Sequence, residues 1–339
     1  MSSTRRLTLR DIAKQAGVSY QTVSRVINNH PYVAEETRQR IHDLIAELDY
    51  HPNKAARSLA TRRSHTLALI TFGMDYYGPA QMVIHIERAA KAAGYDLVLS
   101  IAGDISRGTV QDAIASIMHW QVDGILMIKP VPGVAYDDAI DISGGVPTVQ
   151  INGEKDDRIP SISVEQAVGS RIITEHLLEL GHQHICEISG PLIWYDALER
   201  HESWQQTMRA AGYEPGYSIE GDWTAQGGYR AMQKLLSITR DFTAVVVAND
   251  QMALGALRAL RMEGIRVPED VSVVGFDDVP EAACYEPPLT TVRQEFDVLG
   301  QQGIEYLVER INNPDAPIER HIIYPALIKR LSSAPPRRL

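Results

Sequence analysis

Polar and aromatic side chains follow several apolar, strand-like runs of this sequence. Phe72 ends TLALITF, Asn152 ends VPTVQIN, Asn249 follows FTAVVVA, and Asp277 follows VSVVGF. In open parallel sheets, ligands bind beyond the carboxyl ends of the strands. Amides and carboxylates beside flat aromatic rings suit a sugar, because the hydroxyl groups take the hydrogen bonds and the C–H face of the sugar stacks on an aromatic ring. The pattern therefore predicts a carbohydrate-binding cleft.

A second set of residues suits contact with DNA bases. Gly17 provides a tight turn, and Ser19 can cap the helix that follows. With Val23 and Val26 facing inward, the outward residues of that helix are Tyr20, Gln21, Ser24 and Arg25. Gln and Arg pair bidentately with the edges of adenine and guanine. We therefore predict a helix-turn-helix whose second helix lies in the major groove; the alternative is an ordinary three-helix bundle with a solvated polar face.

The segment after the helices carries a further DNA-binding signal. Leu59, and with it Ala56, is apolar but has no evident core to join, and it stands among Lys54, Arg57, Arg62 and Arg63. An apolar wedge between cations is what kinking of the minor groove requires. The segment is too short to be a stable helix alone, so we expect it to fold conditionally. The alternative is that Leu59 packs against the first domain.

Motifs for catalysis are missing from the sequence. It has no nucleophile elbow, phosphate loop or dinucleotide fingerprint, so we expect neither an enzyme nor a cofactor. His182, His184 and Cys186 alternate at the start of a strand and share a face, but ordinary strand-edge residues are favoured over a metal site. Cys186 and Cys284 are too few for a disulfide framework, and we expect both to be small buried hydrophobes.

The elements that must position these residues belong to more than one domain, since 339 residues with 44% apolar content exceed one ordinary domain. Residues 9–48 predict three short helices, because apolar side chains recur at helical spacing. From Thr66, apolar runs alternate with amphipathic helices near 165–181, 196–211, 226–237 and 250–263. This alternation predicts parallel sheets with helices on both faces, arranged as two similar lobes.

Charge is unevenly distributed along the chain. The 33 Lys and Arg against 43 Asp and Glu give a net charge of −10, yet residues 1–63 hold 11 basic and 6 acidic residues. A small basic module therefore precedes a large acidic one. The sequence lacks both an apolar stretch of membrane-spanning length and the apolar core of a signal peptide, so we expect a cytoplasmic protein without membrane contact.

The motifs resemble those of the LacI/GalR family over nearly the whole chain. TLRDIAKQAGVSYQTVSRVIN is similar to the family's DNA-reading segment, and YHPNKAARSLA to its hinge helix. WTAQGGY, VANDQMALGALRAL, DVSVVGFDD and CYEPPLTTVRQEFDVLG resemble its effector domain. The resemblance implies an all-α helix-turn-helix domain at 1–52 and a hinge helix and linker at 53–64. It then implies, at 65–332, an α/β effector domain of two doubly wound lobes, like a type I periplasmic binding protein.

By the same resemblance the lobes comprise about 65–164 with 296–323, and 165–295 with 324–332, joined by three crossovers. The tail, 333–339, is expected to be frayed.

The resemblance also assigns roles to individual residues. Leu59 inherits the role of the intercalating leucine, and the DNA-binding set is Thr8, Ser19, Tyr20, Gln21, Thr22, Ser24, Arg25, Asn28, Asn53, Ala56 and Leu59. Arg200, Asn249 and Asp277 resemble the groups that hydrogen-bond the effector, and Trp223 resembles its stacking platform. Other positions of the implied effector site are Phe72, Tyr76, Pro79, Met82, Gln294 and Phe296.

Four positions expected at the effector site depart from a well-matched family member. Asn152 stands in place of an aspartate, Val164 in place of a phenylalanine and Asp196 in place of a serine, while Trp194 is additional. An extra carboxylate and an extra indole suit a larger or differently branched saccharide. The identity of the sugar therefore stays open.

The resemblance implies a homodimeric repressor that meets a pseudo-palindromic operator and is released by a sugar, such as a galactoside or another glycoside. We expect a dimer because the C-terminal heptad segment that makes tetramers in one family member has no counterpart after LIKRLSSAPPRRL. One alternative is a corepressor-dependent regulator, in which ligand strengthens DNA binding. An alternative from another class is a sugar-binding transport protein.

Overall fold

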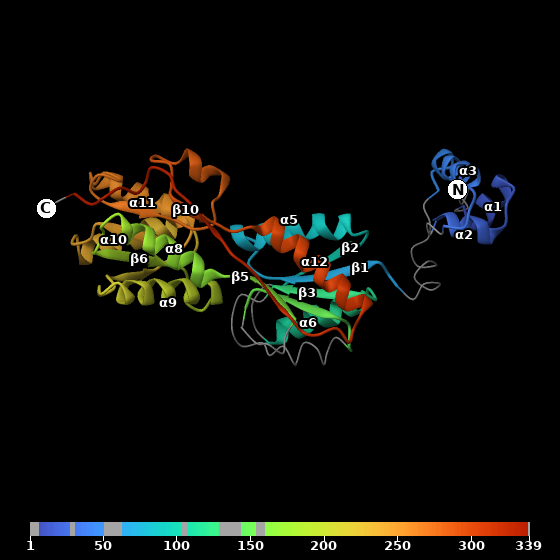
Figure 1. Ribbon diagram of the computed structural model, residues 1–339, viewed down its shortest axis with the longest axis horizontal. Coiled ribbons are helices and arrows are strands. Elements are labelled where there is room, and N and C mark those ends of the chain that lie inside the picture. The colour runs from blue at the N-terminus through green and yellow to red at the C-terminus, as the bar shows by residue number, and fades with distance from the viewer. Residues whose placement is uncertain are drawn as a thin grey trace, which may run out of the picture. The chain divides into compact units, whose positions relative to one another are not determined.

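The computed structural model describes residues 7–27, 31–50, 63–102, 107–128, 144–153 and 160–337, with the backbone alone at 107–111. It divides into two compact units between Ser64 and His65, and each is described by itself (Figure 1). The DNA-binding assignments of Asn28, Asn53, Ala56 and Leu59 lie outside the described residues.

The first unit contains three helices, α1 (Leu9–Ala16), α2 (Tyr20–Ile27) and α3 (Glu35–Glu47). The apolar face of each helix points inward: Ile12, Val23, Val26 and Ile41 are fully buried, as the helical spacing predicts. Gly17 ends α1 in the left-handed region at φ 64°, a conformation that costs glycine little. The helices and the turn of the helix-turn-helix prediction are therefore confirmed.

In the first lobe of the second unit, a six-stranded parallel sheet has the order β11-β5-β4-β3-β1-β2. Its strands are β1 (Thr66–Thr71), β2 (Asp96–Ile101), β3 (Gly124–Ile128), β4 (Thr148–Ile151), β5 (Ser161–Val164) and β11 (Arg320–Ile323). Helices α5 (Tyr77–Ala92) and α12 (Phe296–Asn312) lie side by side on one face, and α6 (Arg107–Met118) lies on the other (Figure 1). The central strands β1 and β3 read as nearly continuous apolar runs because helices cover both of their faces.

In the second lobe, a four-stranded parallel sheet has the order β7-β6-β8-β9. Its strands are β6 (Ile185–Ser189), β7 (Ser218–Glu220), β8 (Ala244–Val247) and β9 (Ser272–Val274). Helices α8 (Gln166–Glu179) and α9 (Tyr195–Ala210) share a core with one face, and α10 (Ala225–Ile238) and α11 (Asp250–Met262) with the other. A short η1 turn (Pro280–Cys284) precedes β10 (Thr291–Arg293), which pairs antiparallel with β12 (Ala326–Ile328).

Three segments carry the chain between the lobes. The first joins β5 to α8 around Glu165, the second joins β10 to α12 through Gln294 and Glu295, and the third joins β11 to β12 through Tyr324 and Pro325. The chain enters the second lobe through the first crossover, leaves it through the second and returns to it through the third. Two doubly wound lobes joined in this way confirm the predicted fold class.

Two local expectations are wrong. The tail is not frayed up to Arg337: Ser333 Oγ lies 3.0 Å from His176 Nε2, and Ala334 N donates to Ser272 Oγ at 3.0 Å. These hydrogen bonds hold the tail against the second lobe. Cys284 is exposed, because the η1 turn directs Ala282 inward instead, whereas Cys186 is buried as expected.

Candidate functional site

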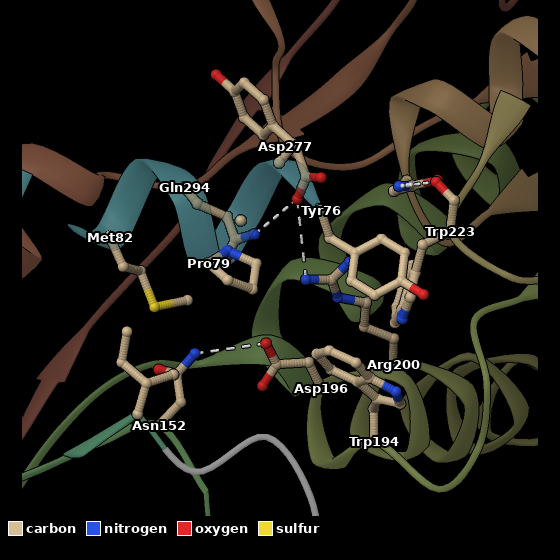
Figure 2. Close-up of a pocket in the computed structure, with 14 residues that line it drawn as sticks. Tyr76, Pro79, Met82, Asn152, Trp194, Asp196, Arg200, Trp223, Asp277 and Gln294 are labelled. Atoms are coloured by element: carbon tan, nitrogen blue, oxygen red, sulfur yellow. Dashed lines mark hydrogen bonds and ion pairs between the residues drawn. The ribbon is translucent and has the colours of Figure 1, made fainter. Parts of the chain in front are cut away.

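A cleft of about 540 Å³, part of it open to solvent, lies between the two lobes of the second unit (Figure 2). The first lobe lines it with residues from the first turns of α5 and the ends of β3 and β4, and the second lobe with the start of α9 and the loops after β7, β8 and β9. The lining residues are Tyr76, Tyr77, Gly78, Pro79, Met82, Ile128, Asn152, Trp194, Asp196, Arg200, Trp223, Asn249, Asp277 and Gln294.

Eleven of the fourteen residues expected at the effector site line this cavity. Phe72, Val164 and Phe296 do not: each is at most 5% exposed and packs into a core of the first lobe. Sequence reasoning missed Tyr77, Gly78 and Ile128. Ile128 is the last residue of β3, so the strand-end rule that selected Asn152 could have found it.

Arg200 is held from several sides at the centre of the cavity wall. Its Nε donates to Gln166 Oε1 at 2.9 Å, Nη1 donates to the carbonyl of Ala248, and Nη2 lies 3.9 Å from Asp277 Oδ1. The guanidinium carbon lies 3.7 Å from the centroid of the Phe276 ring, within the range of a cation–π contact. These contacts fix the orientation of the guanidinium and leave its remaining donors toward the cavity (Figure 2).

Three carboxyl groups lie near this guanidinium: those of Asp277 and Asp250 are buried and that of Asp196 is half-buried. Burial raises the pKa of Asp277 to about 6, although the nearby Arg200 and the hydrogen bond from Gln294 Nε2, at 2.7 Å, act in the opposite direction. Burial also raises the pKa of Asp196, and Arg200 again opposes the shift. Behind them, burial raises the pKa of Asp250 well above its ordinary value. When ionised, both cavity carboxyls, Asp277 and Asp196, can accept hydrogen bonds from a ligand.

Side chains from the two lobes meet directly in the cavity. Asn152 Nδ2 donates to Asp196 Oδ2 across the cleft at 3.4 Å, and Asn152 Oδ1 accepts from the backbone N–H of Val164 at 3.2 Å. The Trp194 ring lies edge to face with Tyr76 of the first lobe, with centroids 5.5 Å apart, and with Trp223, at 6.1 Å. The aromatic cluster offers flat faces beside hydrogen-bonding groups, which is the combination that sugars require.

Three of the lining residues adopt backbone conformations that side chains normally avoid. The φ angles of Asn152, Trp223 and Asp277 are 54°, 69° and 110°. Such angles cost free energy and persist only where the surrounding structure imposes them. Their concentration around one cavity indicates that the orientation of these side chains is fixed before a ligand arrives.

Gly190 permits the close approach of Trp223, which gives a first testable prediction. A Cβ atom at Gly190 would lie 2.2 Å from the indole ring. Gly190→Ala should therefore displace the indole, because the added Cβ has no room. Ligand binding should weaken up to about tenfold, since an aromatic contact contributes roughly 0.5–1.5 kcal/mol. Isothermal titration calorimetry measures the affinity. Gly303→Ala is the matched control, because its added Cβ would make only an ordinary 3.6 Å contact. Unchanged affinity in Gly190→Ala would contradict the prediction.

Apart from Thr8, the described residues predicted to contact DNA lie on or beside α2. Tyr20, Gln21 and Arg25 are exposed on this helix, Tyr20 to 50%, while Thr22 and Ser24 are half-buried. Ser19 Oγ accepts from the backbone N–H of Thr22 at 3.1 Å, which is the predicted cap. Thr8 instead caps α1 in a reciprocal pair with Asp11. Gln21 and Arg25 are thus presented outward by a helix with a fixed start.

The described residues contain neither a metal-binding cluster nor a membrane-spanning helix. No group of three His, Cys, Asp or Glu side chains there could hold a metal ion; His182 instead contacts Thr243 Oγ1 at 2.8 Å and the carbonyl of Ala334 at 2.9 Å. In the same parts of the chain, every helix is too short or too polar to cross a membrane.

Comparisons with known proteins match both units. A family model of bacterial regulatory proteins, lacI family, matches residues 8–53, and one of a periplasmic binding protein-like domain matches residues 174–333. The lactose operon repressor of Escherichia coli (strain K12) is 35% identical over 333 residues, which cover 97% of this chain and 91% of that relative.

Two solved structures extend these matches to the fold. A lac repressor dimer bound to operator and the anti-inducer ONPF is similar with a TM-score of 0.87 at 34% identity, and a complex of the transcriptional regulator CelR with cellobiose with a TM-score of 0.72 at 32% identity. Each match covers 97% of this chain and 100% of the solved chain.

Proposed function

Since this chain belongs to the LacI family of bacterial regulatory proteins, we propose that it is a dimeric, sequence-specific transcriptional repressor whose operator affinity is lowered by a sugar bound between the lobes. The observation that carries the proposal is one cavity in which Arg200, Asn249 and Asp277 stand beside the Trp194–Trp223 aromatic pair. This ligand-binding cavity and the outward-facing Gln21 and Arg25 occur on one chain, as a ligand-responsive DNA-binding protein requires.

The effector we propose is a glycoside. Hydroxyl groups would accept from Arg200 and donate to the carboxylates of Asp277 and Asp196, while a sugar face lies against an indole. Asn249 would accept a ligand hydroxyl at Oδ1, because its Nδ2 already donates to the carbonyl of Trp223 and to Gln251 Oε1, at 3.0 Å each. Trp194 and Asp196 favour a ligand larger than a single ring, and the CelR structure similar to this chain contains the disaccharide cellobiose. A galactoside is equally compatible with the described lining.

The switch we propose follows from the position of the cavity. A sugar that contacts both lobes changes their relative angle and favours the state in which the two hinge helices of the dimer are apart. A coupling free energy of roughly 1–3 kcal/mol would lower operator affinity about 5- to 150-fold, and by linkage the operator would weaken sugar binding equally.

We propose that residues 1–52 form the DNA-reading domain, 53–64 the hinge, 65–332 the effector domain and 333–339 the tail. We also propose that Leu59 of the hinge enters the minor groove. The site of action would be the cytoplasm, where operator DNA lies.

The direct test is operator binding at fixed salt, because electrostatic affinity depends strongly on salt. A symmetric lactose-type operator is titrated with the full chain, with and without galactosides, glucosides and longer oligosaccharides. Release by one sugar, recovered chemically unchanged, supports an inducible repressor and names the effector class. Tighter binding would instead establish corepression, and failure to bind the operator would contradict the base-reading assignment.

The pH dependence of effector binding gives a second prediction. The pKa of Asp277 is raised to about 6 by burial, so this carboxyl gains a proton as the pH falls from 7 to 5. A ligand hydroxyl that donates to the carboxylate loses its acceptor, and affinity should fall about tenfold over this range. Calorimetric titration at several pH values measures it. The Asp277→Asn variant should bind the sugar more weakly at pH 7, and its sugar affinity should depend much less on pH. If the affinity of this variant followed the same pH profile as that of the wild type, the assignment would be contradicted.

A further inference from the structure

The cavity wall contains a buried chain of four side chains that runs through two of the crossovers between the lobes. We define the crossover relay as Arg200–Gln166–Gln294–Asp277. Building on the function proposed above, we propose that Gln166 is a positioning residue that couples ligand contacts at Arg200 and Asp277 to these crossovers. Gln166 lies outside the set that lines the cavity.

The two glutamines occupy equivalent places on different crossovers. Gln166 is the first residue of α8, directly after the chain leaves β5 of the first lobe. Gln294 lies between β10 of the second lobe and α12 on the first. Gln166 Nε2 donates to Gln294 Oε1 at 2.9 Å, so the bond joins positions 128 residues apart in the sequence. The two crossovers are therefore tied together by side chains at the point where the lobes pivot.

The hydrogen bonds of the relay can run in one direction only. Arg200 Nε donates to Gln166 Oε1, Gln166 Nε2 donates to Gln294 Oε1, and Gln294 Nε2 donates to Asp277 Oδ1. A guanidinium has no acceptor and an ionised carboxylate has no donor, so turning either amide around would face donor with donor or acceptor with acceptor. The charged groups at the two ends thus fix the orientation of both glutamines.

Burial makes the relay costly to break. The four residues are between 1% and 6% exposed, so a donor or acceptor that lost its partner would not regain one from bulk water. The two ends of the relay, Arg200 and Asp277, also line the cavity. A ligand that draws these ends toward itself must shift the glutamines and, with them, the backbone of both crossovers. Gln166 therefore couples a ligand contact at Arg200 or Asp277 to the angle between the two lobes.

The first test needs no ligand. Hydrogen exchange of backbone amides is compared in the full chain and in Gln166→Met, which removes the polar groups but retains much of the volume. Faster exchange is expected both near residue 166 and at residues 291–296, on the other crossover. Gln301→Met, at an exposed position on α12, is the matched control and should change neither. Exchange that rises only near residue 166 would overturn the relay.

The second test measures coupling with Gln166→Glu. A glutamate at position 166 can still accept from Arg200 Nε, but when ionised it has no donor for Gln294, so the chain is broken at one bond. The probe is the galactoside, glucoside or longer oligosaccharide that releases the wild-type chain in the operator titration, at a saturating concentration. The ratio of operator affinities without and with this sugar should fall to within about threefold of one, whereas the wild-type ratio is expected to be about 5–150. If this ratio in the Gln166→Glu variant is as large as in the wild type, the relay is overturned, even if the variant binds sugar more weakly.

The two tests separate the relay from the proposed function. If no sugar changes the operator affinity of the wild-type chain, the proposed function is wrong, and the exchange experiment still decides whether Gln166 ties the crossovers together. If Gln166→Met and Gln294→Met each reduce the coupling in part, the double variant should lose no more than the weaker-coupled single variant, because both interrupt the same chain. Additive losses would indicate two independent positioning roles and contradict the relay.

Discussion

Arg200→Ala should abolish the response of operator binding to sugar while leaving operator affinity without sugar nearly unchanged. Arg200 is 5% exposed, and its Nε and Nη1 donate to Gln166 and to the carbonyl of Ala248. Removing it takes a charged donor from the ligand and leaves the buried acceptor Asp277 without its cation, in a cavity where a water molecule cannot reproduce the planar fork. A loss of sugar affinity of about a hundredfold or more is expected, since each lost hydrogen bond between a ligand hydroxyl and the charged guanidinium costs about 1.5–3 kcal/mol.

The measurement combines calorimetric sugar binding with operator titration in the presence of sugar. Arg230→Ala is the matched control, because Arg230 is an exposed arginine of the same lobe whose ion pair, with Asp222 at 2.7 Å, lies on the surface. It should bind sugar as the wild type does, since exposed pairs contribute little. Full induction of Arg200→Ala would refute the role given to this residue.

The double variant Gln21→Ala/Arg25→Ala should lose specific operator binding by about a hundredfold or more while binding to scrambled DNA changes much less. Both side chains are exposed on α2, whose start is fixed by the Ser19 cap. Each bidentate contact with a base edge contributes about 1–3 kcal/mol of discrimination, and two such contacts are removed together. Fluorescence anisotropy with operator and scrambled duplexes at one salt concentration gives both affinities.

Gln39→Ala/Arg40→Ala is a control with the same residue types at exposed positions of α3. If α3 contacts only phosphate, this variant should weaken both duplexes alike, because phosphate contacts carry no sequence information. Equal losses on operator and scrambled DNA in the α2 variant would show that α2 does not read bases.

Features that depend on neighbouring residues were predictable from the sequence. The helices of the first unit follow from apolar side chains at helical spacing, the turn from Gly17, and the start of α2 from Ser19. The parallel sheets follow from apolar runs that alternate with helices. Because ligand sites lie at the carboxyl ends of parallel strands, this local pattern also brought Asn152, Asn249 and Asp277 to one cavity.

The resemblance supplied what periodicity could not. Arg200 and Trp223 carry no local signal that separates them from an ordinary surface arginine or a core indole. Phe72 shows the limit of the strand-end rule, since it directly follows β1 but packs into the core shared with α6. The direction of the side chain that follows a strand depends on how the chain turns at that point, and the sequence of the strand does not specify it.

The tertiary structure alone decided which distant residues meet. Gln166 and Gln294 are ordinary glutamines in the sequence, and only the return of the chain through two crossovers places them 2.9 Å apart. The same holds for Gly190, which becomes indispensable only because Trp223 packs against it. The sequence by itself thus determined the helices, the sheets and most of the cavity's polar lining, since these depend on residues close in the chain. The pairings that orient the lining and connect it to the lobe crossovers depend on contacts between segments far apart, which no local pattern encodes.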